Sequence, residues 1–338
     1  FLDKNLQVKL TQASFPQSEA DALLATNAIY ATIRHWHYHS GGYPILDIMS
    51  DDAHKGSNTN DQLANLGPYD NFTFTTTQDG LDRWWSALYQ GIRRANVVIE
   101  KVPATQMDTT LRNQYIAEAK FLRSLYYFDL VRAWGGVPKV TSTEPPIKLS
   151  RGSSDEIYDL IIQDLKYSIP RLPEKGVQLP EDIGRVTKGA ARALLAKAYL
   201  FRNDFVNAEK YAMEVISSDE YSLETVFADA NGRYGENGVE SVFEVSAMEV
   251  DGGDGPGNQY ANTQGVRGSP NRGWGFNRPA LDLRNSFEAG DPRKDATVIE
   301  LGEIIDGIPI LGDGSTPDEV KDDGGNVIQL ESYNQKVW

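Results

Sequence analysis

Residues 118–138, EAKFLRSLYYFDLVRAWGGVP, form the segment that most limits how this chain can fold. A helix on the surface of a soluble protein shows one apolar stripe with a period of 3.6 residues. Here the apolar side chains point in several directions around that period; they are Phe121, Leu122, Leu125, Tyr126, Phe128, Leu130 and Val131. Because apolar surface is driven out of water, this helix must be covered by neighbours on more than one side.

Apolar spacing and helix-breaking residues predict that the chain is mainly helical up to about Ile216, with its helices in antiparallel pairs. The predicted helices cover residues 18–39, 82–101, 118–134, 154–169 and a pair within 192–215. In that last pair, RALLAKAYLFRNDFVNAEKYAMEV, small and large side chains recur as in tetratricopeptide repeats, and Asn203 with Asp204 makes the turn. Such repeats bury their faces only by stacking, which supplies the cover that residues 118–134 require.

The composition changes after Tyr221, where glycine, asparagine and proline become frequent. SVFEVSA at 241–247 predicts a short strand, while DGGDGPGN at 251–258 and VRGSPNRGWGFNRP at 266–279 predict long loops. Long loops on a rigid scaffold usually carry function. We therefore expect a mainly α protein, with residues 1–220 as a tetratricopeptide-like helical scaffold. Residues 221–338 are expected to form a loop-rich ligand-binding lobe with short strands, packed on the same domain.

The charge balance argues against polyanionic partners. The chain has 33 Lys and Arg against 48 Asp and Glu, a formal net charge of -15, whereas phosphate binding needs a basic face. The sequence therefore predicts no nucleic-acid partner. It also contains no cysteine, no apolar run approaching the length of a membrane span and no recognisable signal peptide. Disulfides, thiolate zinc sites and cysteine nucleophiles are excluded within this sequence.

Three aromatic residues outside the helical pattern are candidates for ligand binding. Tyr43, Tyr260 and Trp274 each lie in a segment containing glycine or proline, where helical packing cannot bury a large ring. Exposed rings suit the apolar faces of pyranose sugars, while nearby polar groups bind the hydroxyls. Trp274, with Asn277 close by, is the first candidate for a sugar platform; the alternative is a loop anchor that plugs into the scaffold.

Asp51 and Asp52, close to His54, are candidates for hydrogen bonds to sugar hydroxyls, because a carboxylate accepts bonds from vicinal hydroxyls as readily as from backbone N–H groups. A turn-capping role is the alternative. A catalytic acid and base pair is less favoured, because adjacent side chains point apart on a strand or helix. Glycoside hydrolysis needs two carboxyl groups held across a cleft, and the sequence nominates no such pair.

The sequence predicts no metal or nucleotide cofactor. Residues 35–39 contain three of the four histidines, and His35 and His39 would align on a helix, but no third ligand accompanies them. We favour a helix end that packs Trp36 inward with its imidazoles toward solvent. The acidic loops at 251–258 and 312–326 do not fit the EF-hand spacing, and no phosphate-binding glycine motif occurs.

Several segments in this order resemble the SusD/RagB family of glycan-binding outer-membrane lipoproteins of Bacteroidetes. They are IMSDDAHKG at 48–56, RWWSALYQGIRRAN at 83–96, EAKFLRSLYYFDLVRAWGGVP at 118–138, GRVTKGAARALLAKAYL at 184–200 and GWGFNRPALDLRNSFEAGDPR at 273–293. The resemblance implies tetratricopeptide-like helix pairs, a loop-rich lobe and binding without catalysis. It also implies capture of an oligosaccharide or polysaccharide at the cell surface and its delivery to a SusC-like TonB-dependent transporter for import.

Two departures accompany the resemblance. Family members are anchored through an N-terminal lipidated cysteine, so the resemblance implies an outer-membrane anchor on a cysteine upstream of Phe1. Members also continue beyond the position of Trp338 with further helices, so we expect a truncated chain whose helical stack lacks part of its cover.

A peptide or another nutrient is the alternative cargo, because helical repeats have concave surfaces suited to peptides. A hydrolase and a purely structural interaction module are the remaining alternatives.

Overall fold

The computed structural model describes residues 15–38, 44–232, 235–246, 259–314, 319–321 and 324–338. The chain forms two compact units, each built from several segments. Among the described residues, the first unit takes those within 1–33, 86–222 and 242–245, and the second takes those within 34–85, 223–241 and 246–338. The sequence indicates a change of character near Tyr221, whereas segment 34–85 groups with the later residues because its strand pairs with one of theirs.

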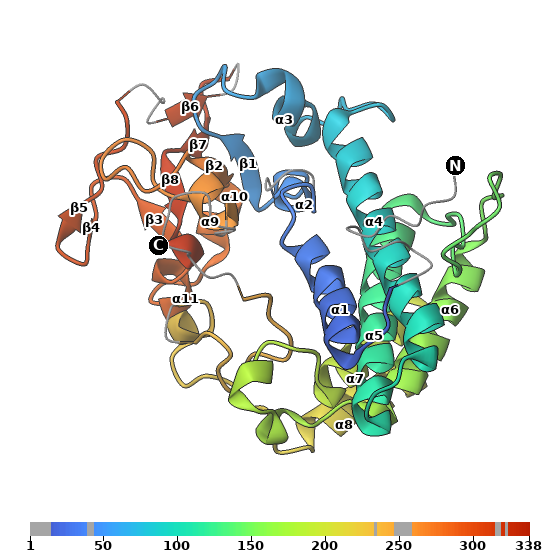
Figure 1. The fold of residues 1–338 in the computed structure, drawn as a ribbon. Coiled ribbons are helices and arrows are strands. Elements are labelled where there is room, and N and C mark those ends of the chain that lie inside the picture. Colours follow the sequence, from blue (N-terminus) through green and yellow to red (C-terminus); the bar gives the residue numbers. More distant parts are fainter. Residues whose placement is uncertain (1–14, 39–43, 233–234, 247–258, 315–318, 322–323) are drawn as a thin grey trace, which may run out of the picture. The chain divides into compact units, whose positions relative to one another are not determined.

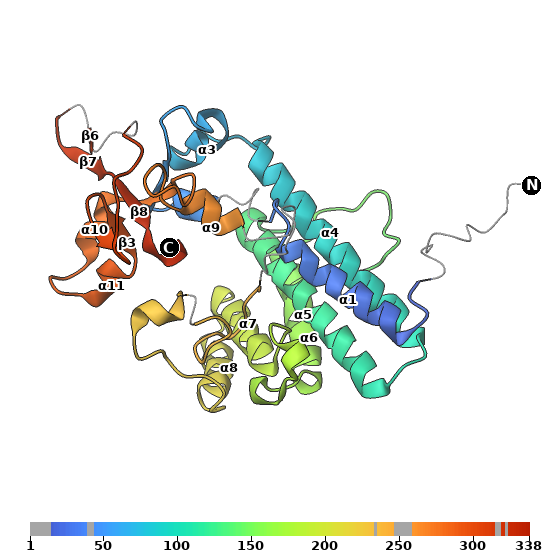
Figure 2. The same cartoon turned by 60° about the vertical axis from the view of Figure 1, so that its left-hand side comes forward.

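The first unit is a stack of helices (Figure 1). It contains α1 (Glu19–Ile33), α4 (Asp79–Lys101) from Ser86 onward, α5 (Thr109–Trp134), α6 (Ser154–Ser168), α7 (Lys188–Phe201) and α8 (Phe205–Ile216). Contacts join α5 to α1 and α6, α6 to α7, and α7 to α8, and Figure 2 shows α1, α4 and α5 side by side from a second direction. The predicted scaffold of tetratricopeptide-like helix pairs is confirmed.

Local interactions define where these helices begin and turn. The Asp108 carboxylate accepts a hydrogen bond from the Leu111 backbone N–H at 2.8 Å and caps α5. Ser153 and Glu156 form a reciprocal capping box at the start of α6. Asn203 adopts the left-handed conformation, with φ of 59°, and allows the sharp turn between α7 and α8 that the sequence predicts.

α5 is covered on several faces, as its apolar pattern requires. Phe121, Leu122 and Tyr126 are at most 2% exposed, and Phe128 is equally buried. The Tyr126 hydroxyl donates to the Ile29 carbonyl of α1 at 2.7 Å, while α6 packs along another side of the helix. The prediction that helices cover this segment on both sides is confirmed.

Buried charges within the first unit have partners. Arg123 in α5, 4% exposed, donates from Nε to Asp164 of α6 at 2.8 Å and from a second nitrogen to the Asn96 side chain at 2.7 Å. Lys120 reaches the same carboxylate at 2.6 Å. A charge buried in this way is tolerated only when it is paired and hydrogen-bonded, so the network ties α4, α5 and α6 together.

α8 leaves much of its apolar surface exposed. Its residues Phe205, Val206, Met213 and Ile216 are at least 50% exposed. In a helical repeat each helix is buried by its neighbours, and α8 is contacted chiefly by α7.

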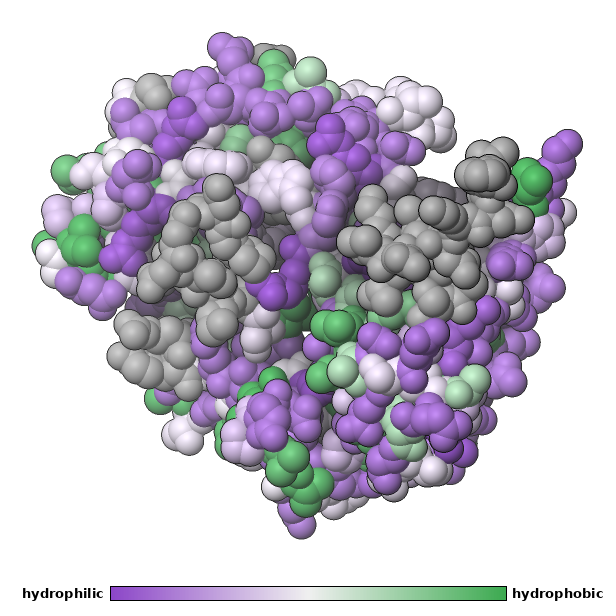
Figure 3. Space-filling model, in the orientation of Figure 1, coloured by the Kyte–Doolittle hydropathy of each residue, from purple (hydrophilic) through white to green (hydrophobic). Residues whose placement is uncertain are grey.

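Figure 3 shows that hydrophilic residues dominate the face drawn there, with hydrophobic residues in separate small groups. Among the described helices, none is both long and apolar enough to cross a membrane.

The second unit is built from short strands and short helices. Antiparallel pairs join β1 (Ala53–Gly56) to β2 (Phe276–Pro279), β3 (Val298–Glu300) to β8 (Ser332–Asn334), β4 (Ile304–Ile305) to β5 (Ile308–Pro309), and β6 (Glu319–Lys321) to β7 (Val327–Leu330). The helices are α2 (Ile45–Ile48), α3 (Leu63–Asp70), α9 (Gln259–Gln264), α10 (Leu281–Ser286) and α11 (Pro292–Asp295). A small core packs Val266, Ile299, Ile310 and Tyr333, with Ile305 and Trp338 against it. The predicted short strands in a loop-rich region are confirmed.

Two local predictions are wrong. α1 ends at Ile33 rather than near His39, because Trp36 makes a tertiary ring contact from a turn instead of continuing the helix. The predicted strand at 241–247 does not form over its described residues, 241–246. Instead, the Phe243 ring packs edge-on against Phe121, with ring centroids 5.2 Å apart. A short apolar alternation can therefore be satisfied by packing on a helix, without a partner strand.

The contact between His54 of β1 and Asp70 of α3 predicts a pH dependence. His54 Nδ1 lies 3.2 Å from Asp70 Oδ1, and this hydrogen bond raises the pKa of His54 above its ordinary value of 6.5, although burial opposes the shift. Because the folded pKa exceeds the unfolded one, the stabilisation is complete below about pH 6.5 and is lost as the pH rises through the folded pKa. An NMR titration of the imidazole should give a midpoint above 6.5 that Asp70→Asn lowers. The control is Asp51→Asn, which changes an exposed carboxylate. If it shifted the midpoint as much as Asp70→Asn does, the raised pKa of His54 could not be assigned to Asp70.

Candidate functional site

Trp274 lies on a loop whose backbone is closely packed. Its N–H donates to the Asn262 carbonyl at 2.9 Å, and Gly275 N–H donates to Gly265 O at 3.0 Å. Gly273 and Gly265 approach so closely that a Cβ on Gly273 would lie 2.6 Å from Gly265 Cα. The glycines therefore fix the path of the backbone, and the indole of Trp274 is presented with 39% of its surface exposed.

The Trp274 ring meets Trp36, which follows α1 in the sequence. The two ring centroids are 6.3 Å apart and the planes are inclined at 67°, an edge-to-face arrangement. We call Trp36 and Trp274 the aromatic pair. Trp36 is half-buried, so the interpretation that it simply packs inward at a helix end misses its contact with the loop.

Tyr260 is the second residue of the short helix α9 instead of lying in an irregular loop, and it is 40% exposed. Partial burial, and after it the nearby Asp47 carboxylate, raises the pKa of its phenol above the ordinary value of 10.0. A protonated phenol can both donate to and accept from a ligand hydroxyl. The exposed Asp47 contributes acceptors beside it.

The side chain of Asn277 is buried, and only 5% of the residue's surface is exposed. Its φ of 54° is left-handed, a conformation that asparagine adopts more readily than most residues. The Asn277 amide donates to Asp47 at 3.0 Å and to Gln264 at 2.7 Å, and Asn334 donates to the same Gln264 oxygen at 2.9 Å. This network orients Asp47 beside Tyr260.

Asp51 and Asp52 are exposed in the turn between α2 and β1. The Asp52 backbone N–H donates to the Ser50 hydroxyl at 3.2 Å, and its carbonyl accepts from Ala280 N–H at 2.8 Å. The structure thus ties their turn to the end of β2 and shows no direct bond from either carboxylate to the aromatic pair in the described part of the chain. Tyr43, the third aromatic candidate, lies outside the described residues.

Sequence reasoning missed two residues of this surface, Trp36 and Asp47. Trp36 stands in a run of histidines that drew attention to metal binding. Asp47 precedes the Asp51–Asp52 pair by one helical turn and has no distinguishing motif. The available signal for Trp36 was the presence of a large ring beyond the end of a regular helix, the same signal that identified Trp274.

The nearby basic side chains are already engaged. Lys55 is 7% exposed, and its ammonium donates to the carbonyls of Gly56, Asn58 and Asp61 at 2.8, 3.0 and 2.9 Å. The Arg272 guanidinium lies 3.9 Å from the ring centroid of Trp338. The Asp47 carboxylate lies close enough to Tyr260 to affect its pKa, and a negative charge there suits a neutral or cationic ligand better than a sulfated or uronic one.

The first unit is a stack of helix pairs, and the second unit presents exposed aromatic rings. These features define the chain as a helical-repeat protein with a candidate binding surface. Residues 1–200 match the SusD-like family described as starch-binding and associating with the outer membrane. The chain belongs to this family, as its sequence motifs imply. It is 27% identical over 319 residues to SusD-like protein P2 of Formosa agariphila, across 87% of this chain and 60% of that protein.

Solved structures share the fold. A laminarin-binding SusD-like protein has a TM-score of 0.77 and 26% identity, across 94% of this chain and 78% of that one. Surface glycan-binding protein A from Bacteroides thetaiotaomicron, in complex with laminarihexaose, has a TM-score of 0.76 and 23% identity, across 95% and 71%; this second likeness concerns the fold. The chain spans about 60% of the length of the curated relatives it matches. The family description agrees with the prediction of binding without catalysis.

Proposed function

We propose that this protein binds an oligosaccharide or polysaccharide at the cell surface and delivers it to a SusC-like TonB-dependent transporter of the outer membrane. The observation that carries the proposal is the aromatic pair, in which Trp36 meets the indole of Trp274 edge to face and Trp274 lies on a loop held by close glycine contacts. Membership of a family described as starch-binding and outer-membrane-associated supports the ligand class and the location. The laminarin-binding structural relative supports a glycan as the cargo.

The geometry suits a pyranose ring. The axial C–H groups of a sugar face carry partial positive charge and would pack against the negative face of Trp274, while Trp36 supports that indole through an edge-to-face contact. In this proposal the Asp47 carboxylate and the neighbouring Tyr260 hydroxyl bind ring hydroxyls. Asn277 acts beneath them by orienting Asp47. We propose that Tyr43, Asp51 and Asp52 extend this surface to further sugar units.

The affinity for one sugar segment should be modest. Each sugar hydroxyl exchanges a hydrogen bond with water for one with protein, so the net gain per bond is small. Attachment of the protein to the membrane, through a lipid on a cysteine upstream of Phe1, would hold captured glycan at the transporter and raise its effective concentration there. In this proposal the ligand contacts come from the second unit, from Trp274 and Tyr260 within residues 221–338 and from segment 34–85, and the helices of the first unit supply the scaffold.

Replacing Trp274 by alanine should weaken glycan binding by roughly 30-fold, because a central aromatic contact contributes about 2 kcal/mol or more. Isothermal titration with laminari-oligosaccharides and a panel of neutral and charged glycans measures this. Phe205→Ala, which removes a ring that is 61% exposed on α8, is the matched control and should leave affinity unchanged.

Three results would speak against the proposal. Flat titrations across the whole panel would remove glycan binding as the function of this chain. Equal losses in Trp274→Ala and Phe205→Ala would move the site away from the aromatic pair. Binding of peptides in place of glycans would favour the alternative cargo over the one proposed here.

A further inference from the structure

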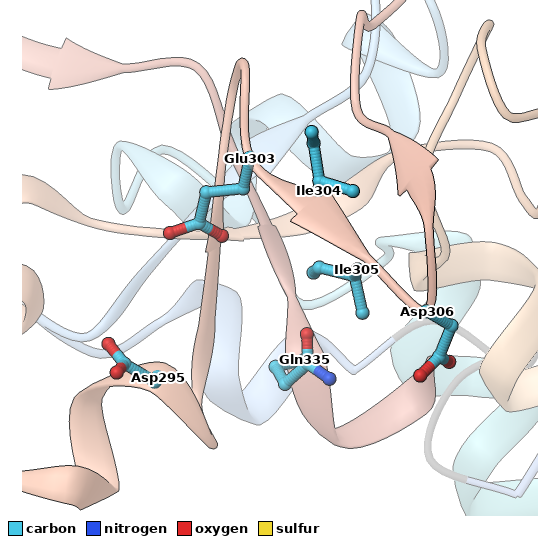
Figure 4. A pocket seen from close by; sticks show the side chains of 6 residues that line it. All are labelled: Asp295, Glu303, Ile304, Ile305, Asp306 and Gln335. Atoms are coloured by element: carbon cyan, nitrogen blue, oxygen red, sulfur yellow. The ribbon is translucent and has the colours of Figure 1, made fainter.

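A separate pocket lies within the second unit and belongs to none of the elements that carry the aromatic pair (Figure 4). Its volume is about 430 Å³, within the range of small-molecule sites. It is lined by Asp295 at the end of α11, by Glu303, Ile304, Ile305 and Asp306 of the β4–β5 hairpin, and by Gln335. We call it the acidic pocket.

The walls of the acidic pocket are held by the fold. Asp306 and Gly307 form the two-residue turn between β4 and β5, with φ of 53° and 78°, a geometry that matches the twist of a hairpin. Ile305 packs against the small core of the second unit. The Trp338 indole N–H donates to Asp306 Oδ2 at 2.8 Å. These contacts position the carboxylate of Asp306 without neutralising its charge.

The polar groups that line the pocket are mainly hydrogen-bond acceptors. Within the described parts of the chain, no lysine or arginine forms an ion pair with Asp295, Glu303 or Asp306. Glu303 accepts one backbone hydrogen bond, from Glu300 N–H at 3.0 Å. The Oε1 atom of Gln335 is buried and has no donor among the described residues. Figure 4 shows Asp295 and Glu303 to one side of Ile305 and Gln335, and Asp306 to the other.

We propose that the acidic pocket is a subsite for a sugar unit that carries a free amine, such as a glucosamine residue of a de-N-acetylated glycan. This inference rests on the proposed glycan-binding function and names a charge preference within it. A protonated amine supplies the donors and the positive charge that the lining lacks. Ile304, which is 71% exposed, and Ile305 offer apolar surface to the sugar ring. A bare divalent cation would need several carboxylates gathered on one point, and among the described residues no three His, Asp or Glu side chains are placed to hold a metal ion.

Two substitutions remove charge from the pocket while keeping its shape. Glutamine at position 303 can still accept the hydrogen bond from Glu300 N–H, and asparagine at 306 tolerates a positive φ and can still accept from the indole. Glu303→Gln/Asp306→Asn is therefore the test variant. Glu288→Gln, which removes one charge from an exposed position on the same unit, is the control for bulk electrostatics.

The experiment is isothermal titration with the glucosamine hexamer, the N-acetylglucosamine hexamer and cellohexaose, which share a β-1,4 backbone and differ in the substituent. The unaltered protein should prefer the glucosamine hexamer at pH 6, and the preference should fall with added salt. In Glu303→Gln/Asp306→Asn the preference should drop roughly tenfold or more, the size expected for charge-assisted hydrogen bonds. Glu288→Gln should retain it.

Each other outcome overturns the inference. Equal affinity of the unaltered protein for the three hexamers would show that it has no preference for the amine. A loss of the preference in Glu288→Gln as large as that in Glu303→Gln/Asp306→Asn would show that the preference does not come from the pocket. Calcium binding at the pocket that blocks the glucosamine hexamer would reassign it to a metal ion. The proposed function is judged separately by the Trp274→Ala titrations, because neutral glycans that bind through Trp274 support it whether or not the acidic pocket prefers amines.

Discussion

Asp164→Ala should lower the free energy of unfolding of the helical unit by about 3–5 kcal/mol, the usual cost of leaving a buried charge without its partner. Asp164 is 1% exposed and bonds Arg123, which is 4% exposed, and Lys120. Lys120 can extend its ammonium toward water, but Arg123 cannot, so the penalty falls mainly on the guanidinium. Urea unfolding followed by far-ultraviolet circular dichroism measures the loss.

α6 itself supplies the matched control for this result. Asp159 on the same helix pairs with Arg202 at 2.6 Å, but its side chain is 67% exposed. Asp159→Ala should therefore cost less than about 1 kcal/mol. The double variant Arg123→Met/Asp164→Leu removes both charges and should recover much of the loss. Similar losses in Asp159→Ala and Asp164→Ala would show that burial does not govern this network.

Gly273→Ala should disrupt the Trp274 loop and weaken glycan binding at least as much as Trp274→Ala. The added Cβ would lie 2.5 Å from the Asn262 carbonyl oxygen and 2.6 Å from Gly265 Cα, and both are backbone atoms. The loop must shift to relieve these contacts, at about 1–3 kcal/mol. Because Trp274 N–H bonds the same Asn262 carbonyl, the indole would move with it. Titration with laminari-oligosaccharides and tryptophan fluorescence follow the two effects.

Gly176→Ala is the control for a glycine substitution without a backbone clash. Its nearest contact would be Glu220 Oε2 at 3.2 Å, the end of a flexible side chain. We expect it to leave both affinity and fluorescence unchanged. Normal binding by Gly273→Ala would mean that the loop accommodates the methyl group without moving Trp274, and that the glycine contacts are not what holds the indole.

The helical scaffold could be predicted because its signals are local. Helix periodicity places Phe121, Leu122 and Tyr126 around the axis of α5, and capping residues such as Ser153 mark where a helix begins. The same reasoning extended α1 to His39, because no proline or glycine breaks the pattern before residue 41. The chain leaves the helix at Ile33, where a ring contact from a distant segment replaces a helical turn.

The binding surface was only partly predictable. Trp274 and Tyr260 could be selected because large rings stand in or beside segments rich in glycine, a feature visible in the sequence. Asp47 could not, because its role depends on a hydrogen bond with Asn277, 230 residues away. Asn277 was chosen as a ligand contact from its proximity to Trp274 in the sequence, whereas the structure shows it 95% buried beneath Asp47.

The sequence by itself determined the tetratricopeptide-like helix pairs, the loop-rich second half and the family. Helix periodicity and capping can be predicted from the sequence because they depend on residues a few positions apart, and the family can be predicted because its motifs follow one another in a fixed order. Only the tertiary structure decided that residues 34–85 join the later part of the chain, through the pairing of Ala53 with Pro279. Within the same unit, Trp36 contacts Trp274 and Asp47 accepts a hydrogen bond from Asn277. Contacts between residues more than 200 positions apart depend on how complete elements pack, and short-range patterns do not encode that packing.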